Sequence, residues 1–169
     1  LLSAAADGTI KLWHADELVP LHLLGAPAAH AAAVYALHIV PAAPAAAGMT
    51  PAAATSAAAT AACTSPRLFS ASADKLIKVW DLNTLECTRQ LGAHRSFVCA
   101  LASSSTRLFS ASSDKTCIVW DLRTLHRLRT YVGHTSGLYA LAVVDGLVCT
   151  GSLDETVRVW RQPEAARDN

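Results

Sequence analysis

Four tryptophans at a fixed distance from an aspartate constrain the fold of this chain more than any other feature. Each Trp follows an Asp by six residues, in the pairs Asp7/Trp13, Asp74/Trp80, Asp114/Trp120 and Asp154/Trp160. The last three tryptophans are 40 residues apart. Tryptophan is a rare residue, so chance does not account for four equal offsets. A repeat of this period is typical of a chain built from copies of one supersecondary unit.

Each repeat predicts a β-hairpin centred on its aspartate. Residues 67–81 read RLFSASADKLIKVWD and residues 107–121 read RLFSASSDKTCIVWD, and the segments 1–14 and 147–161 follow the same plan. A short β-rich run leads into a turn on Asp-Lys, Asp-Glu or Asp-Gly, and a run of alternating apolar and polar residues follows. This combination is typical of two antiparallel strands joined by a tight turn.

Two further strands are predicted in each repeat. The segments HAAAVYAL, HRSFVCAL and HTSGLYAL begin at His30, His94 and His134, upstream of the hairpins. Another run lies between each Trp and the next His, at 18–24, 85–91 and 125–131. Each complete unit therefore has four short strands, and the whole chain has about 14.

The predicted boundaries follow from this period. We expect an incomplete first unit at 1–24, a second at 25–91, a third at 92–131, an incomplete fourth at 132–162 and a tail at 163–169. A tract of Ala, Pro, Thr and Ser at 41–66 interrupts the second unit. It carries almost no charge and no amphipathic period, which predicts a disordered surface insertion. A short helix over 52–62 is the alternative.

Composition excludes several classes of protein. A net charge of +1 gives no reason to expect nucleic acid or a membrane surface as a partner. No apolar run approaches the roughly 20 residues of a membrane helix. The five cysteines include no C-x-x-C pair, and four lie in predicted strands, where a thiol behaves as a small buried hydrophobe. We therefore expect no metal site and an intracellular location, cytoplasmic or nuclear.

These repeats resemble the WD40 repeat family, whose unit carries a GH pair and a WD pair. Gly133-His134 matches the first pair, and Trp80-Asp81 and Trp120-Asp121 match the second; Ala29, Ala93, His14 and Arg161 depart from the pattern. The resemblance implies an all-β fold: a partial β-propeller of about 3.5 four-stranded antiparallel blades. Because propellers of this family usually have seven blades, we expect a fragment whose remaining blades are missing from this chain. The isolated chain should aggregate, fold poorly or form oligomers.

The resemblance also implies a structural hydrogen-bond network in each blade, made by a His, a Ser or Thr, an Asp and the Trp. The predicted sets are His30, Ser70, Asp74 and Trp80; His94, Ser110, Asp114 and Trp120; His134, Thr150, Asp154 and Trp160. Ser72 and Ser112 are alternatives on the same strand faces. His, Ser and Asp together also suggest a hydrolase triad, but a set that recurs at the repeat period indicates a structural role. We expect no catalytic residue and no cofactor.

The resemblance places partner contacts three and five residues after each repeat His and just before each turn Asp. These positions hold Ala33, Tyr35, Ala73, Phe97, Cys99, Ser113, Gly137, Tyr139 and Leu153. The set is aromatic and apolar and has no charge, so we expect it to bind an apolar or aromatic peptide segment. The alternative is that the aromatic rings pack within their own blades. We expect the insertion to leave from the opposite face.

The predicted function is a non-catalytic scaffold that binds other proteins or peptides. A second possibility is the substrate-recognition region of a ubiquitin ligase, because the compact repeats are similar to those of TRAF-type RING ligases and F-box WD40 proteins. A nucleic-acid-binding propeller would need a basic stripe. The local basic cluster consists of Arg123, Arg127 and Arg129, which a solvated strand edge explains equally well.

Overall fold

The computed structural model of the chain describes residues 1–24, 29–42 and 65–162. Within these ranges the chain forms 14 β-strands and no helix, so nothing in them is a helix that could cross a membrane. The strands are β1 (Leu2–Ala4), β2 (Ile10–Trp13), β3 (Pro20–Leu24), β4 (Val34–Val40), β5 (Arg67–Ser72), β6 (Leu76–Asp81), β7 (Cys87–Gly92), β8 (Val98–Ser103), β9 (Arg107–Ser112), β10 (Thr116–Asp121), β11 (Arg127–Val132), β12 (Leu138–Val144), β13 (Leu147–Ser152) and β14 (Val157–Arg161).

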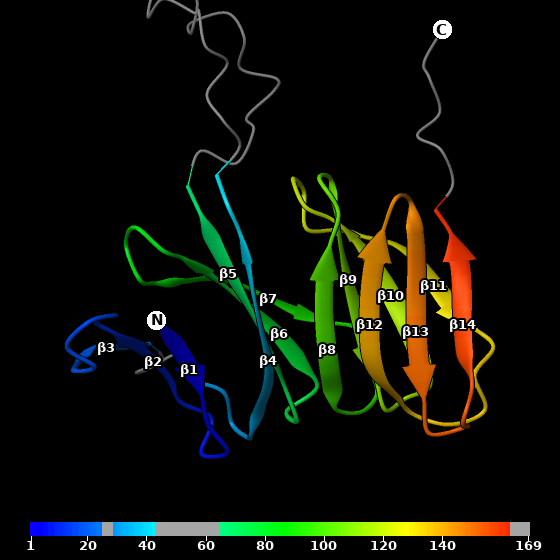
Figure 1. Cartoon of the computed structure of the whole chain (residues 1–169), viewed down its shortest axis with the longest axis horizontal. Helices are drawn as coiled ribbons and strands as arrows, with labels where there is room; N and C mark the ends of the chain where they lie inside the picture. Colours follow the sequence, from blue (N-terminus) through cyan, green and yellow to red (C-terminus); the bar gives the residue numbers. More distant parts are fainter. Residues whose placement is uncertain (25–28, 43–64, 163–169) are drawn as a thin grey trace, which may run out of the picture.

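The strands form four antiparallel sheets that follow one another along the molecule (Figure 1). Sheet 1 has the order β1-β2-β3, sheet 2 the order β4-β5-β6-β7, sheet 3 the order β8-β9-β10-β11 and sheet 4 the order β12-β13-β14. Sheets 1 and 4 lie at the two ends and have three strands each. Nearly all of the predicted insertion, and with it the alternative of a helix at 52–62, lies outside the described residues.

The strand register gives every sheet two different faces. Paired residues point to the same side of a sheet and alternate along a strand, so Trp80 lies beside Leu68 on one face and Val79 lies beside Phe69 on the other. We call the first the Trp-bearing face and the second the aliphatic face. The aliphatic face carries, in β2, β6, β10 and β14 respectively, Ile10 and Leu12, Ile77 and Val79, Cys117 and Val119, and Val157 and Val159.

The core lies between neighbouring sheets, where an aliphatic face meets the next Trp-bearing face. Ile10 of sheet 1 packs in one cluster with Trp80 of sheet 2. Val79 packs in the next cluster with Trp120, and Val119 packs in the third with Trp160. The apolar surface removed from water at these contacts stabilises the fold. A single sheet therefore has no core of its own and depends on its neighbours.

Polar contacts join sheets 2 and 3 in addition to this packing. The guanidinium of Arg67 donates to the carbonyl oxygen of Leu122, and His38 Nε2 lies 2.8 Å from Ser103 Oγ. Burial lowers the pKa of the His38 imidazole, because it penalises the charged form.

The expectation that the strand cysteines are buried holds for one of them. Cys117 is fully buried in the contact between sheets 3 and 4, whereas Cys87, Cys99 and Cys149 are half-buried. All four are free thiols. Cys87 lies in β7, the last strand of sheet 2, and Cys149 lies in sheet 4 at one end of the row of sheets. Fewer neighbouring atoms cover a side chain at these places. Cys63 lies outside the described residues.

Gly8 in the turn of sheet 1 generates a prediction about stability. Its φ is +84°, and a Cβ atom there would lie 2.4 Å from the carbonyl oxygen of His30. We expect Gly8→Ala to lower the free energy of unfolding by about 2 kcal/mol or more, since the left-handed backbone alone costs an L-residue about 1–2 kcal/mol. Urea denaturation followed by circular dichroism measures the change.

Gly146 is the matched control for this substitution. Its φ is +76°, but no atom lies within 4 Å of the Cβ position. Gly146→Ala should therefore show the backbone cost without the clash. Equal losses in the two variants would contradict the packing role of Gly8.

Candidate functional site

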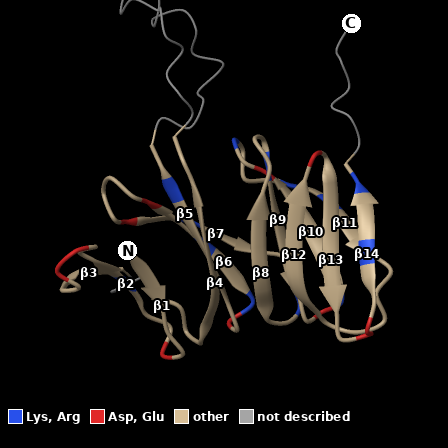
Figure 2. Ribbon diagram, viewed as in Figure 1, with Lys and Arg blue, Asp and Glu red and all other residues tan. Residues whose placement is uncertain are grey.

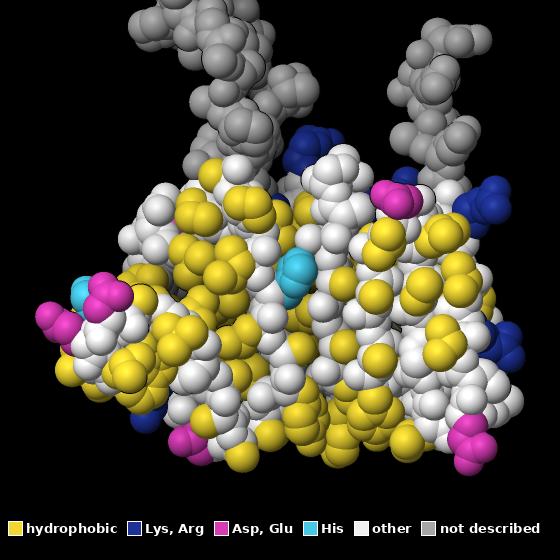
Figure 3. Space-filling model, viewed as in Figure 1, with side chains coloured by type: hydrophobic (Ala, Val, Ile, Leu, Met, Phe, Trp, Pro, Cys, Tyr) yellow, Lys and Arg dark blue, Asp and Glu magenta, His cyan; other side chains and the backbone are white. Residues whose placement is uncertain are grey.

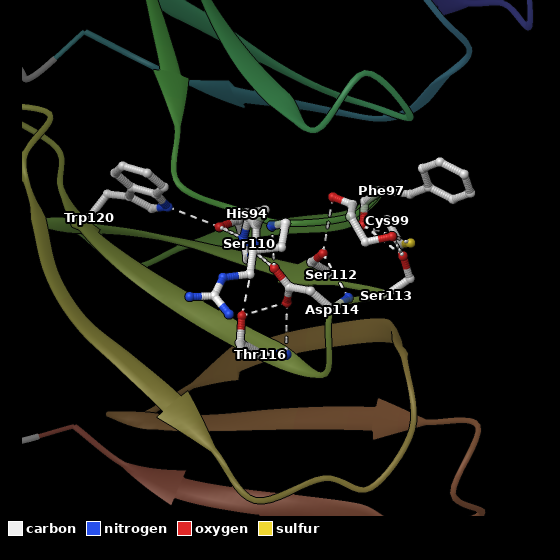
Figure 4. A network of polar contacts seen from close by, with 11 residues as sticks. His94, Phe97, Cys99, Ser110, Ser112, Ser113, Asp114, Thr116 and Trp120 are labelled. Carbon is white, nitrogen blue, oxygen red and sulfur yellow. Dashed lines mark hydrogen bonds and ion pairs between the residues drawn. The ribbon is translucent and has the colours of Figure 1, made fainter.

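Sheet 3 holds a connected set of polar side chains that come from β9, β10 and the loops beside them (Figure 4). His94 lies just before β8, Ser110 in β9, Asp114 in the following turn and Trp120 in β10. His94 Nδ1 lies 2.9 Å from Asp114 Oδ2, and His94 Nε2 lies 2.8 Å from Ser110 Oγ. Trp120 Nε1 donates to the same Ser110 Oγ at 2.9 Å. The four side chains thus form one network.

The donors in this network determine its protonation. An indole N–H only donates, so Ser110 Oγ accepts from Trp120. The Asp114 carboxylate only accepts, so His94 Nδ1 carries a ring proton and donates it to Asp114. In the neutral ring, His94 Nε2 then accepts from the Ser110 hydroxyl. Every buried polar atom in the chain of bonds has a partner, which is the condition for burying such groups in a core.

The same geometry recurs in sheets 2 and 4. In sheet 2, His30 lies 2.7 Å from both Asp74 Oδ2 and Ser70 Oγ, and Trp80 Nε1 donates to Ser70 at 2.9 Å. Sheet 4 uses a threonine in place of serine: His134 lies 2.8 Å from Asp154 and 2.8 Å from Thr150, and Trp160 donates to Thr150 at 2.9 Å.

Sheet 1 has a reduced version of the network. Trp13 Nε1 donates to Ser3 Oγ at 2.7 Å, and the carboxylate of Asp7 accepts from the amide and hydroxyl of Thr9. The indole-to-hydroxyl bond is therefore common to all four sheets.

The alternative serines have a different task. Ser72 and Ser112 lie two residues nearer the turn than Ser70 and Ser110, and each donates to a carbonyl oxygen of the loop after the repeat His: Ala32 for the first and Ser96 for the second. Each also accepts from the backbone amide of the turn aspartate. Ser152 makes the same two contacts in sheet 4.

Sequence reasoning missed two groups that hold the turn carboxylates. Thr116 and Thr156 each donate a hydroxyl hydrogen bond of 2.6 Å to the aspartate two residues earlier. Backbone amides of the residues after the repeat His, including Arg95 and Thr135, donate to the other carboxylate oxygen. The Asp-x-Thr spacing was a visible signal for the first group, whereas backbone donors leave none.

Hydrogen bonding sets the charge of these groups. Burial alone would raise the pKa of the Asp114 carboxyl, but the bonds from His94, Thr116 and the Arg95 amide outweigh it and hold the pKa well below its usual range. The pKa of Asp74 is lowered in the same way, chiefly by His30. The pKa of His30 is also lowered, because burial outweighs its bond to Asp74. The folded state of sheet 2 thus favours an ionised carboxylate beside a neutral imidazole.

The order Ser–His–Asp is that of a hydrolase triad, but the network is built for support. Ser110 Oγ is fully buried and already accepts the indole proton of Trp120. A nucleophile must reach its substrate, and this hydroxyl faces the contact between two sheets. Within the described part of the chain, no group of three His, Cys, Asp or Glu side chains is arranged to hold a metal ion.

The predicted aromatic contacts lie at the starts of β4, β8 and β12, the first strands of sheets 2, 3 and 4. Tyr35 in β4, Phe97 before β8 and Tyr139 in β12 are 53%, 45% and 52% exposed. The rings of Tyr35 and Phe97 lie with their centroids 6.3 Å apart, although they belong to different sheets. Figure 3 shows hydrophobic side chains gathered along this edge, at the bottom of the view below β8 and β12. These exposed fractions argue against the alternative that the rings pack inside their blades.

The other predicted contact residues surround this aromatic row. Leu153 is 66% exposed in the turn of sheet 4. Ser113 and Cys99 are half-buried beside Phe97, and both bond to its carbonyl oxygen. Gly137 is buried: a Cβ there would meet Ser113 and the ring of Tyr139. It therefore supports Tyr139 from below and offers no contact surface itself.

The end of β4 and the start of β5 flank the insertion. Both lie at the upper edge of sheet 2 in Figure 1, opposite the edge where β4 begins with Val34 and Tyr35. The path of the predicted insertion itself lies outside the described residues.

Comparison with known proteins identifies the repeats. A family model described as "WD domain, G-beta repeat" matches residues 55–81, 85–121 and 125–161, well over half of the chain. No curated protein matches the chain significantly.

Solved structures share the fold. The computationally designed Ika4 protein is 30% identical with a TM-score of 0.74, and the match covers 96% of this chain and 84% of that one. The computationally designed Ika8 protein is 31% identical with a TM-score of 0.71, covering 95% and 42%. The WD40 β-propeller domain of Doa1 is 27% identical with a TM-score of 0.69, covering 95% and 46%. The chain thus spans less than half of the Ika8 and Doa1 chains, and the predicted partial propeller fold is confirmed.

Ser110 generates a prediction about the network. Ser110→Ala removes the acceptor of Trp120 Nε1 and the partner of His94 Nε2, leaving two buried polar atoms without a bond. We expect the free energy of unfolding to fall by about 2–3 kcal/mol, the cost of unsatisfied buried groups. Ser105→Ala, an exposed serine two residues before β9, is the control and should change stability by less than about 0.5 kcal/mol. Similar losses in both variants would rule out the network as a source of stability.

The lowered pKa values predict that acid destabilises the chain in two stages. The pKa of His30 is below its ordinary 6.5, so the unfolded chain takes up this proton first and stability falls as the pH drops through about 6.5. The aspartate pKa values are also lowered, so the contribution of these groups is complete above the ordinary 3.8 and is lost as the pH falls below it. Denaturation midpoints measured across this range follow both stages.

Asp114→Asn tests the second stage. The variant should be less stable than the unchanged chain at neutral pH, and the difference should shrink below about pH 4, where the carboxylate contribution disappears. A difference that stays constant down to about pH 2 would show that ionisation of Asp114 does not contribute to stability.

Proposed function

Since this chain belongs to the WD40 repeat family, we propose that it is a non-catalytic protein-interaction scaffold that binds peptide segments along the edge carrying Tyr35, Phe97 and Tyr139. WD40 domains generally serve as interaction scaffolds. The observation that carries the proposal is the row of three exposed aromatic rings on three successive sheets. Aromatic side chains are frequent energetic centres of protein interfaces.

The network residues prepare this edge for binding. Asp114 accepts from the amide of Arg95, and Ser112 donates to the carbonyl of Ser96, so the loop leading to Phe97 is held from two sides. The amide of Ser113 also donates to the carbonyl of Phe97 at 3.0 Å. A loop fixed before binding loses little conformational freedom when a partner docks. The buried network thereby holds in place the loop that carries the exposed binding residue Phe97.

The chemistry of the edge favours an apolar or aromatic partner segment. None of the predicted contact residues is charged, so the contact row itself offers a phosphate or an acidic side chain no ion pair in exchange for its water. Ser113 and Cys99 supply the polar atoms beside Phe97. We expect a segment with at least one large apolar side chain that packs against the Tyr35–Phe97 pair.

The other functions considered have less support. The comparisons give no relation to TRAF-type RING ligases or F-box WD40 proteins, so a role in a ubiquitin ligase stays a prediction that rests on the residue pattern of the repeats. Arg123, Arg127 and Arg129 are exposed on and just before the outer strand β11, and charged residues of both signs are scattered over turns and strand ends (Figure 2). An intracellular location rests on the cysteine pattern alone.

A peptide-display selection tests the proposed function. Random peptides selected on the chain should be rich in aromatic and large aliphatic residues and poor in acidic ones. The double variant Phe97→Ala, Tyr139→Ala should bind the selected peptides at least about tenfold more weakly, because truncated interface centres cost more than about 1.4 kcal/mol. Both side chains are exposed, so the variant should keep its fold.

Leu128→Ala is the matched control for this test. Leu128 is 53% exposed but lies in the outer strand β11, away from the aromatic row. Equal binding by the unchanged chain, the control and the double variant would refute the proposed site.

A further inference from the structure

One face of sheet 4 lacks the cover that the same face has elsewhere in the chain. Val157 and Val159 on the aliphatic face of β14 are 71% and 59% exposed. Their counterparts in β6 and β10 are at most 3% exposed, because a following sheet packs on them. The difference arises from the neighbours and not from the residue type, since all these side chains are apolar.

The uncovered face is apolar across its three strands except at one end, where the exposed Arg161 follows Val157 and Val159 on β14. Residues that pair with Val157 and Val159 across the sheet share their face: Gly151 and Ala140 beside the first, Cys149 and Ala142 beside the second. Figure 3 shows hydrophobic side chains gathered over β12–β14 at the right of the view. Next to Gly151 the surface forms an open hollow of about 390 Å³, which Leu153 and Val157 help to line.

This face has smaller side chains than its counterparts. The position of Cys149 holds Phe69 in sheet 2 and Phe109 in sheet 3, and the position of Gly151 holds an alanine in both. A partner of sheet 4 therefore needs more apolar bulk than the partner of sheet 2 or sheet 3.

The internal contacts of the chain define what fits such a face. In all three contacts between neighbouring sheets, the aliphatic face is covered by a face that presents a tryptophan: Trp80, Trp120 and Trp160. The fourth aliphatic face has the same order and register over its three strands as the first three strands of sheets 2 and 3, and within the described residues it lacks their outer strand. Its partner should therefore also be a Trp-bearing sheet.

Within the described ranges, the Trp-bearing face of sheet 1 has no other sheet packed on it; Trp13 is half-buried, and Lys11 Nζ lies 5.9 Å from the centroid of its ring. Leu1 pairs with Trp13 through two backbone bonds, as Leu68 pairs with Trp80. Leu1 is 68% exposed, whereas Leu68 is fully buried. The outer strand of sheet 1 adds Leu23, which is 47% exposed and stands where sheets 2 and 3 have Gln90 and Thr130. Sheet 1 thus offers additional apolar bulk.

We propose that the aliphatic face of sheet 4 binds the Trp-bearing face of sheet 1 in a second copy of the chain. The contact joins two different faces, so each copy has one of each to offer, and such head-to-tail contacts close into rings when the rotation allows. The Ika8 and Doa1 chains have room for a second copy, because one copy covers 42% of the first and 46% of the second, whereas it covers 84% of the Ika4 chain.

Light scattering on the purified 169-residue chain, coupled to size exclusion, tests the contact. We expect a species of twice the 17.7 kDa chain mass. Val159→Lys should reduce it to the mass of one chain, because it places a charge in the apolar contact. Val132→Lys is the matched control: Val132 is 70% exposed in β11, outside both faces, and this variant should keep the doubled mass.

A mixing experiment separates this contact from any other kind of association. Leu23→Glu should also yield single chains, because it alters the other face. Neither variant alone can form the contact, because every pairing meets one altered face. In an equal mixture, the Trp-bearing face of a Val159→Lys chain and the aliphatic face of a Leu23→Glu chain are both intact, so mixed dimers held by one contact should form. Native mass spectrometry distinguishes these from dimers of one variant. Circular dichroism of each variant verifies that it is folded.

Several results would overturn the proposal. They are an unchanged chain with the mass of one copy, a doubled mass that Val159→Lys leaves intact, and a mixture that forms no mixed dimer while both variants are folded. Larger assemblies that Val159→Lys dissolves and Val132→Lys does not would support the same contact in an open array. Tyr139 also lines the hollow beside Gly151, so the variant that separates the two proposals is Phe97→Ala alone, which should weaken peptide binding and keep the doubled mass.

Discussion

A hydroxyl that accepts a hydrogen bond from an indole N–H is the interaction on which this structure depends. It occurs in every described sheet, half-buried at Ser3 with Trp13 and fully buried at Ser70, Ser110 and Thr150. In sheets 2, 3 and 4 the tryptophan that makes this bond packs against the preceding sheet. In sheets 2, 3 and 4 the same hydroxyl meets the repeat histidine, and through it the turn aspartate and the loop that carries the aromatic row. The packing between sheets and the shape of the candidate binding edge therefore have a common support.

Much of this could be predicted from the spacing of residues. The distance from Asp to Trp implied the hairpins, and resemblance to WD40 repeats implied the partners of His94 and Asp114, which the structure brings together. The choice between Ser110 and Ser112 could not be made from the pattern, because residues two apart share a strand face. What separates them is distance to the indole and to the loop carbonyl, which depends on the twist and packing of the strands. The carboxylate contacts of the Arg95 amide were also out of reach, since any residue can supply a backbone donor.

The exposure of particular side chains was the least predictable property. Tyr35 and Val34 are adjacent, and only the geometry of the strand start directs the first to solvent and the second to the core. Gly137 occupies a contact position by count but is buried under Tyr139. Val159 and Val79 occupy the same position in their repeats, yet Val159 is 59% exposed and Val79 is fully buried, because a following sheet packs on the second and not on the first. Local patterns report strands and turns well, whereas neighbours decide which surfaces remain free.

The two-faced construction of each sheet has a consequence for how such proteins change in evolution. Every repeat encodes the contact with its neighbour, and nothing in a repeat encodes how many neighbours there are. Duplication or loss of a whole repeat therefore leaves all other internal contacts chemically unchanged. No single repeat determines the total number of repeats. That number depends on whether the aliphatic face of the last sheet can meet the Trp-bearing face of the first. Chains of this construction can change length by whole units while their cores stay the same.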